Sequence, residues 1–286
     1  MIVIEVVFLL VFWAWVFAAT LFLRQTVLPR LPIIMSPPPP AETVRFPATD
    51  GVSLEGWLLP GEAGRPWILI CHGVGANRAD LLDIASTLRS AGFNLFLFDF
   101  RGHGASGGLA TSFGWREQRD LEGALAYLGQ QDIPPKPYGI YGISMGAAVA
   151  LLVAARDERL GAVAVDSPYT DLEDSLGRHL ALMYPALPRQ PFLWFILATY
   201  RLRFGVWPRQ VSPTASAARL SPRPLLLIQG AEDPRMPVAG AQAIAAAAGP
   251  PKDLWIVPGA GHLEGYAFDP QGYQSRLISF FESSLK

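Results

Sequence analysis

The stretch Gly142-Ile-Ser144-Met-Gly146 decides the fold of this chain. A short apolar run, residues 137–141, precedes it, and an alanine-rich helical run over residues 145–156 follows it. A serine with glycines two positions before and after it can project from a tight turn between a strand and a helix. The glycines remove the Cβ atoms that would collide there, and the helix N-terminus favours a developing negative charge. The stretch therefore predicts Ser144 as a nucleophile at the carboxyl end of a strand.

Apolar runs typical of buried strands alternate with helical segments along most of the chain. The strand-like runs cover residues 66–71, 94–99, 137–141, 161–165, 224–228 and 253–257, and the helical segments cover residues 78–91, 115–128, 145–156, 239–248 and 271–285. Two further β-prone runs, residues 43–46 and 54–58, flank the turn dipeptide Asp50-Gly51 and predict an antiparallel hairpin. Such alternation is typical of a parallel sheet covered on both faces. We therefore predict an α/β fold with a mostly parallel, eight-stranded sheet and helices on both faces.

Two later loops carry residues that could activate the serine. A serine hydroxyl needs a base to accept its proton, and the base needs a carboxylate to fix its tautomer. Residues 225–230 form a buried-strand run that leads into a loop with Asp233, and residues 254–257 form another that leads into a loop with His262. Both loops follow the carboxyl ends of strands, the edge where open α/β sheets place their sites. We predict Asp233 as the acid and His262 as the base for Ser144.

Other residues could fill these two roles. Glu232 adjoins Asp233 and is an alternative acid. His72, His103 and His179 are alternative bases. The first two lie in glycine-rich turns, where we expect each histidine to hydrogen-bond its own loop. His179 lies in a segment without a recognisable motif, where we expect exposure to solvent.

The tetrahedral intermediate of acyl transfer needs two preorganised donors for its oxyanion, usually backbone amides. The residue after the nucleophile supplies one, which here is Met145. The second comes from the loop after an earlier strand, where His72-Gly-Val74-Gly75 is rich in glycine. The sequence therefore predicts an oxyanion hole made of the backbone amides of Met145 and Val74.

Composition excludes several classes of protein. The 286 residues are 51% hydrophobic, which is enough for one large core, and the formal net charge of -1 provides no basic surface for nucleic acid. The single cysteine, Cys71, lies in an apolar run and predicts a buried thiol without an internal disulfide. The four histidines do not have the spacing of metal ligands. We expect no metal, no cofactor and no nucleic-acid partner.

The first 24 residues differ in kind from the rest. They are almost unbroken apolar sequence, and about 22 residues at roughly 1.5 Å per residue would cross a hydrocarbon core of about 30 Å. A cleaved signal peptide is the alternative, but the basic n-region expected of one is absent. We expect a single-pass transmembrane anchor over residues 1–24 and a proline-rich linker over residues 25–41. Arg24 and Arg30 follow the apolar segment, which favours a cytoplasmic catalytic domain.

The alternation of strands and helices is interrupted over residues 171–220. An interruption of this length predicts a helical cap or lid with its own structure. Within it, residues 192–198 are apolar almost all round and precede Tyr200, Arg201 and Arg203. This segment fits a lid helix over an acyl pocket or at a bilayer, and it fits equally well a helix packed into the domain core.

Taken together, these motifs resemble the α/β-hydrolase superfamily, and within it the esterase-like members of the serine aminopeptidase S33 and BEM46-like group. The motifs that carry the resemblance are Asp50-Gly51, His72-Gly73, Asp99-Phe-Arg-Gly-His-Gly-Ala-Ser106, Gly142-Ile-Ser-Met-Gly146, Asp166-Ser-Pro-Tyr169, Gly230-Ala-Glu-Asp-Pro-Arg-Met-Pro237 and Gly261-His262. The resemblance implies a catalytic domain over residues 42–286 with the triad Ser144, Asp233 and His262. It gives the Arg-Gly-His-Gly turn a structural role only.

The expected chemistry is hydrolysis of carboxylic esters or thioesters through an acyl-enzyme intermediate. The substrate would be a small acyl ester, and an apolar cap beside a membrane anchor suggests a lipid-like one. A serine peptidase or an acyltransferase would use the same triad, so both stay open, and a noncatalytic binding protein on the same fold is a more distant alternative. The sequence sets no oligomeric state.

Overall fold

The computed structural model describes residues 2–26, 36–37, 39–131 and 137–285. These residues form an eight-stranded sheet in the order β1-β2-β4-β3-β5-β6-β7-β8. The strands are β1 (Glu42–Pro47), β2 (Ser53–Leu59), β3 (Trp67–Cys71), β4 (Asn94–Phe98), β5 (Tyr138–Ile143), β6 (Leu160–Asp166), β7 (Leu225–Gly230) and β8 (Lys252–Val257). β2 runs antiparallel to β1 and β4, and all other neighbours are parallel. The predicted eight-stranded, mostly parallel sheet is confirmed.

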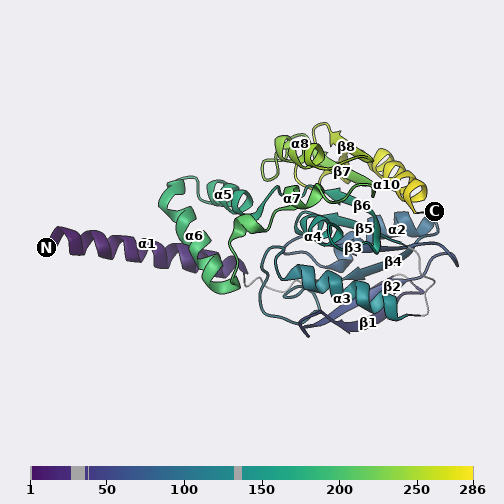
Figure 1. The fold of residues 1–286 in the computed structure, drawn as a ribbon, viewed down its shortest axis with the longest axis horizontal. Helices are drawn as coiled ribbons and strands as arrows, with labels where there is room; N and C mark the ends of the chain where they lie inside the picture. Colours follow the sequence, from purple (N-terminus) through teal and green to yellow (C-terminus); the bar gives the residue numbers. More distant parts are fainter. Residues whose placement is uncertain (1, 27–35, 38, 132–136, 286) are drawn as a thin grey trace.

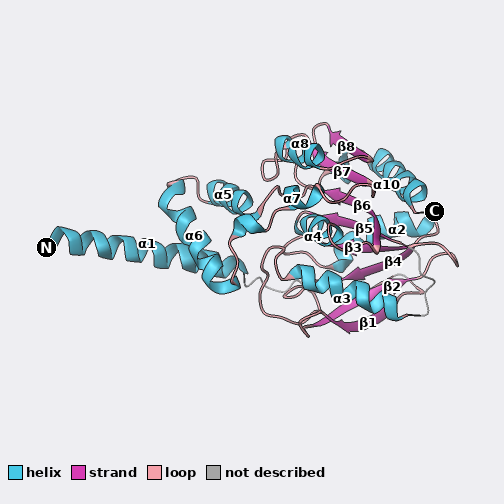
Figure 2. Ribbon diagram, in the orientation of Figure 1, coloured by secondary structure: helices cyan, strands magenta, loops and turns pink. Residues whose placement is uncertain are grey.

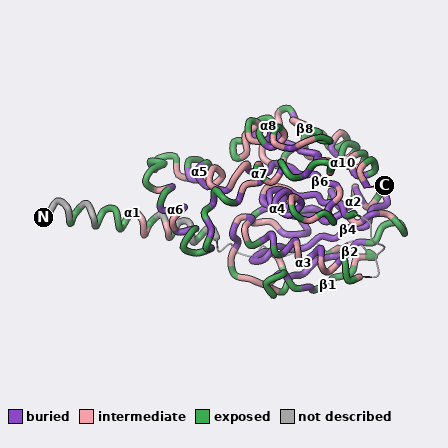
Figure 3. The backbone as a smooth tube through the Cα atoms, viewed as in Figure 1, coloured by how far each residue is buried: buried purple, intermediate pink, exposed green. Residues whose placement is uncertain are grey.

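Helices cover both faces of this sheet, as the alternating pattern predicts (Figures 1 and 2). One face packs against α3 (Glu117–Gln130), α4 (Met145–Ala154) and α8 (Val238–Ala247), and the other against α2 (Leu82–Ser90) and α10 (Pro270–Ser284). Successive residues of β3 alternate between the two faces: Leu69 joins the first apolar cluster, and Ile68 and Ile70 join the second. Of the central strands, β4 is buried along its whole length and β3 in all but its first residue (Figure 3). This burial explains why they appear in the sequence as continuous apolar runs.

The cap consists of the helices that connect β6 and β7. They are α5 (Leu172–Met183), α6 (Arg189–Phe204), the short 3-10 helix η2 (Pro208–Gln210) and α7 (Pro213–Ala217). α5 and α6 share an apolar cluster with Leu152 of α4, and the Tyr200 hydroxyl of α6 donates to the carbonyl of Ser112 at 2.9 Å. These contacts hold the cap against the sheet domain at the edge where the strands end. Two short helices complete the domain, namely η1 (Arg78–Leu81) and α9 (Gly265–Phe268).

Residues 2–26 form the helix α1 (Ile2–Thr26), which lies beside α6 and away from the sheet (Figure 1). The ring of Phe17 meets that of Phe192 edge to face at 6.4 Å, and Trp15 packs against the apolar cluster of the cap. Part of the apolar surface of α1 is therefore used in packing against the protein itself.

Within the described part of the chain, no helix is long and apolar enough to cross a membrane. The transmembrane helix expected over residues 1–24 is thus not supported, although a helix does form there. Membrane attachment and the side on which the catalytic domain lies stay predictions. Most of the predicted linker, residues 27–35 and 38, lies outside the described residues.

The Arg-Gly-His-Gly turn holds the domain together through buried ion pairs. The Arg101 guanidinium contacts Asp120 at 2.6 Å and Asp50 at 2.7 Å, and its own side chain is only 5% exposed. It thereby ties the turn after β4 both to α3 and to the β1–β2 hairpin. This arrangement agrees with a structural role for the turn.

Replacing Arg101 with methionine should lower the free energy of unfolding by about 3–5 kcal/mol, because it leaves the buried carboxylate of Asp120 without its counter-charge. Urea unfolding followed by circular dichroism would measure the loss. The matched control is Arg159→Met, which removes an arginine from the partly exposed pair with Asp157 and should cost about 1 kcal/mol or less. Equal losses in the two variants would contradict this role for Arg101.

Candidate active site

The serine stands on a strained turn between β5 and α4. Ser144 has φ 50° and ψ −115°, a backbone conformation that side-chain-bearing residues rarely adopt. The flanking glycines are required by close contacts: a Cβ at Gly142 would lie 2.5 Å from the carbonyl oxygen of Gly146, and one at Gly146 would lie 2.3 Å from that of Cys71. The backbone amide of Ser144 donates to the carbonyl of Asp166 at 2.8 Å. The turn therefore holds the hydroxyl of Ser144 at the carboxyl edge of the sheet.

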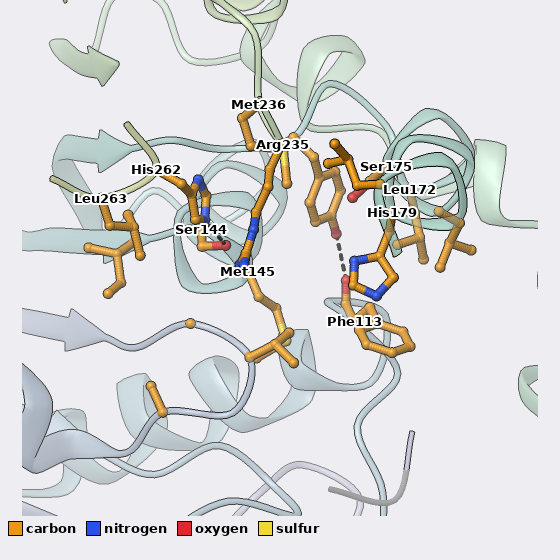
Figure 4. Close-up of a pocket in the computed structure, with 17 residues that line it drawn as sticks. Phe113, Ser144, Met145, Leu172, Ser175, His179, Arg235, Met236, His262 and Leu263 are labelled. Carbon is orange, nitrogen blue, oxygen red and sulfur yellow. Dashed lines mark hydrogen bonds between the residues drawn. The ribbon is translucent and has the colours of Figure 1, made fainter. Parts of the chain in front are cut away.

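The structure brings Ser144, His262 and Asp233 into one chain of contacts (Figure 4 shows the serine and the histidine). His262 Nε2 lies 3.2 Å from Ser144 Oγ, and His262 Nδ1 lies 2.6 Å from Asp233 Oδ2. In this arrangement Asp233 accepts the Nδ1–H proton, which leaves the lone pair of Nε2 free to accept the serine proton. This is the geometry that general-base activation of a serine requires.

The environment of Asp233 keeps its carboxylate charged. Its side chain is fully buried, and burial works to raise its pKa. The hydrogen bond from His262 and the backbone amides of Met236 and Arg235, which donate to Oδ1 at 2.9 Å and 2.8 Å, outweigh burial and place the pKa below its ordinary value. Gln229 Nε2 adds a contact to Oδ2 at 3.2 Å. The loop after β7 thus presents an oriented anion to the imidazole.

The alternative acid and bases occupy other positions. Glu232 is exposed, and the carboxylate that contacts His262 is that of Asp233. His72 is buried, accepts from the amide of Phe100 and bonds the carbonyl of Gly73, and burial lowers its pKa to about 3. His103 is also buried and bonds the carbonyl of Arg101.

The expectation that His179 is exposed to solvent is wrong. It is half-buried on α5 and lines the cavity in front of Ser144 (Figure 4). Its position could not be predicted because it depends on how the cap folds back over the sheet.

A cavity of about 290 Å³ opens in front of Ser144. Most of its wall is apolar, with contributions from Phe113, Leu172, Leu176, Leu182, Met236 and Leu263 (Figure 4 labels most of these). Val74 and Met145, whose amides we expect to bind the oxyanion, line the same cavity. The polar groups of the wall include Ser144, His262, Ser175, His179 and Arg235. A small apolar chamber with a few polar groups near a nucleophile suits an acyl chain.

The cap reaches the cavity through α5, not through the segment expected to act as a lid. Leu172, Leu176 and Leu182 of α5 line the cavity, whereas its lining includes none of residues 192–198. On α6, Phe195 and Leu197 are buried in the apolar cluster of the cap, and Trp194 is 59% exposed. Of the two alternatives for residues 192–198, these observations favour a helix that packs within the protein over a lid that lines the cavity.

Two features of the site were not singled out from the sequence. Asp166, at the end of β6, receives hydrogen bonds from the hydroxyls of Tyr273 at 2.7 Å and Ser167 at 2.8 Å, and burial raises its pKa. It braces the backbone behind Ser144. Arg235, two residues after Asp233, turns its side chain into the cavity (Figure 4). Its place in the motif around Asp233 was the available signal.

The described residues contain no group of three or more His, Cys, Asp or Glu side chains that could hold a metal ion. Cys71 is buried in β3, and burial raises the pKa of its thiol. The expected absence of a metal and a cofactor stays a prediction.

Comparison with known proteins identifies a matching family and related bacterial proteins. The model of the alpha/beta hydrolase family matches residues 68–273. The uncharacterized protein YqkD of Bacillus subtilis (strain 168) is 30% identical over 242 residues, which cover 83% of this chain and 78% of YqkD. The uncharacterized protein YfhR of Escherichia coli (strain K12) is 28% identical over 253 residues, covering 86% of this chain and 82% of YfhR.

Solved structures show the same architecture. The Pyrococcus furiosus esterase Pf2001 has a TM-score of 0.74 at 25% identity, and the match covers 91% of this chain and all of the esterase. An esterase from Exiguobacterium antarcticum has a TM-score of 0.64 at 15% identity, covering 84% of this chain and all of that protein. At that lower identity the likeness concerns the fold alone.

Proposed function

Because this chain belongs to the alpha/beta hydrolase family, we propose that it is a serine hydrolase that cleaves carboxylic esters or thioesters through an acyl-enzyme intermediate. The observation that carries the proposal is the contact chain from Ser144 through His262 to Asp233 at the wall of an apolar cavity. The likeness to the Pyrococcus furiosus esterase supports the same reaction class. The finer assignment to the S33 and BEM46-like group stays a prediction.

The proposed reaction assigns a role to each of these residues. Ser144 Oγ attacks the ester carbonyl while His262 Nε2 takes its proton, and Asp233 stabilises the imidazolium that forms. The backbone amides of Val74 and Met145 donate hydrogen bonds to the developing oxyanion. Collapse breaks the bond to the alcohol, which leaves with the proton from His262. A water molecule then attacks the acyl-enzyme with the same base and releases the acid.

The alternatives differ in what the cavity would have to bind. An aminopeptidase needs an acidic group for the ammonium of its substrate, but none of the described residues that line the cavity is acidic. An acyltransferase would use the same first half-reaction and pass the acyl group to an acceptor other than water. A binding protein on this fold would not need a base in contact with the hydroxyl of Ser144.

The test is hydrolysis of p-nitrophenyl esters from acetate to decanoate by the purified full-length protein, together with labelling by a fluorophosphonate probe. We expect hydrolysis with an optimum at short to medium acyl chains, because the cavity holds about 290 Å³, and we expect the label on Ser144. Mass spectrometry of the labelled peptide identifies the residue. Labelling without ester turnover would favour an acyltransferase or peptidase, and a protein inert to both reagents would favour a binding protein.

A further inference from the structure

Arg235 brings a positive charge to the wall of the cavity beside the reacting groups. Its backbone amide is fixed by a 2.8 Å hydrogen bond to Asp233 Oδ1, so the loop that orients the acid also sets the position of the arginine. Its side chain lines the cavity together with Ser144 and His262 and extends between them and α5 (Figure 4). Since Arg235 is exposed, its guanidinium is accessible to a substrate that enters the cavity.

The charge of Arg235 is not neutralised within the described part of the protein. No carboxylate described in the structure forms an ion pair with it, and no described residue that lines the cavity is acidic. By contrast Arg178, which shares an adjoining pocket with Arg235, pairs with Asp174 at 2.7 Å. Among the described residues that line the cavity, Arg235 is thus the one arginine or lysine, and it offers a ligand a positive charge that no described carboxylate pairs with.

The neighbouring histidine responds to this charge. His179 lies across the cavity on α5, and burial together with the charge of Arg235 lowers its pKa. Both effects favour the neutral form of the imidazole, so His179 does not share the positive charge of Arg235. Apolar side chains such as Leu172 and Met236 line the cavity beside this charge.

We propose that Arg235 makes the cavity selective for esters that carry a carboxylate a few bonds from the scissile ester, such as monoesters of dicarboxylic acids. The guanidinium would bind that carboxylate by charge-assisted hydrogen bonds. The selectivity concerns the substrate of the proposed hydrolase and therefore rests on that function. It also disfavours substrates with an ammonium group at the same place.

Two pairs of esters that differ in one terminal group test the proposal. Monoethyl adipate and ethyl hexanoate differ by a carboxylate on the acyl side, and 4-acetoxybutyrate and butyl acetate differ by one on the alcohol side. Hydrolysis is followed by pH-stat titration. In the wild type, kcat/KM should be higher for the anionic ester than for its neutral partner in at least one pair, namely the pair that places its carboxylate on the side of the ester facing Arg235. Arg235→Gln should reduce that preference, which is the ratio of kcat/KM for the anionic ester to kcat/KM for its neutral partner, by about tenfold.

Three controls separate charge recognition from a structural effect. Arg235→Lys should keep most of the preference because the positive charge remains. Arg178→Gln removes the same charge from the adjoining pocket and should leave the preference unchanged. Raising the salt concentration from about 20 mM to about 500 mM should reduce the preference in the wild type but not in Arg235→Gln, because salt screens exposed charges.

Two outcomes would overturn the inference and leave the proposed hydrolase intact. In the first, the neutral esters are hydrolysed but neither anion is preferred. In the second, the preference survives in Arg235→Gln. Absence of hydrolysis of all four esters would instead count against the hydrolase. Competition with fluorophosphonate labelling then decides the inference: monoethyl adipate or 4-acetoxybutyrate should protect Ser144 better than its neutral partner in the wild type, and equal protection would overturn it.

Discussion

Replacing Ser144 with alanine is expected to lower kcat for ester hydrolysis by about a million-fold, the size of loss seen when the nucleophile of a serine triad is removed. Alanine keeps the Cβ atom and removes only Oγ, which lies 3.2 Å from His262 Nε2. The strained turn at φ 50° should therefore persist, and the fold with it. The residual rate would come from water attack assisted by the oxyanion amides. Stopped assays with p-nitrophenyl butyrate measure the loss of kcat. A labelling gel measures the loss of reaction with a fluorophosphonate probe, which we also expect.

The control for Ser144→Ala is Ser86→Ala, which removes the hydroxyl of an exposed serine on α2, outside the residues that line the cavity. It should retain full activity and full labelling. Unchanged turnover in a Ser144→Ala preparation with an unaltered circular dichroism spectrum would exclude the acyl-enzyme mechanism. A million-fold loss accompanied by a melted spectrum would show a folding defect instead, and Ser144→Cys would then replace alanine as the test.

The sheet and the turn at Ser144 could be predicted because both leave local signals in the sequence. Strands such as β3 and β7 are buried on both faces and appear as apolar runs, and Gly142 and Gly146 are demanded by contacts of 2.5 Å and 2.3 Å. The positions of Asp233 and His262 follow from a general rule, since loops after parallel strands share one edge of the sheet. Sequence alone thus places three side chains near one another without fixing a distance.

The cap could not be predicted at the same level, because its helices pack through contacts between residues distant in the sequence. Residues 192–198 are the most apolar part of the segment, yet the cavity is lined by α5, whose apolar face is interrupted by Ser175 and His179. The apolar character of α1 predicted a helix, but its contact with Phe192 of the cap has no signal in its own sequence. The position of the Arg235 side chain could not be predicted either, because only the folded loop shows where that side chain points.

Replacing Asp233 with asparagine is expected to lower kcat by about ten thousand-fold, and the cause lies in how the carboxylate is held. Two backbone amides donate to Oδ1, so the oxygen of an asparagine would stay there and its amino group would take the place of Oδ2, facing His262 Nδ1. A donor at that place forces Nδ1 to act as the acceptor and puts the proton on Nε2. The imidazole then meets Ser144 with a proton where a lone pair is needed.

The control for Asp233→Asn is Glu232→Gln, the same change at the neighbouring exposed carboxylate, and it should leave kcat within about twofold of the wild type. KM for a neutral ester should hardly change in either variant, because neither carboxylate lines the cavity. A larger loss in Glu232→Gln than in Asp233→Asn would assign the acid to Glu232. Small losses in both variants would mean that another carboxylate orients the imidazole, and the buried Asp166, whose charge also acts on His262, would be the next residue to replace.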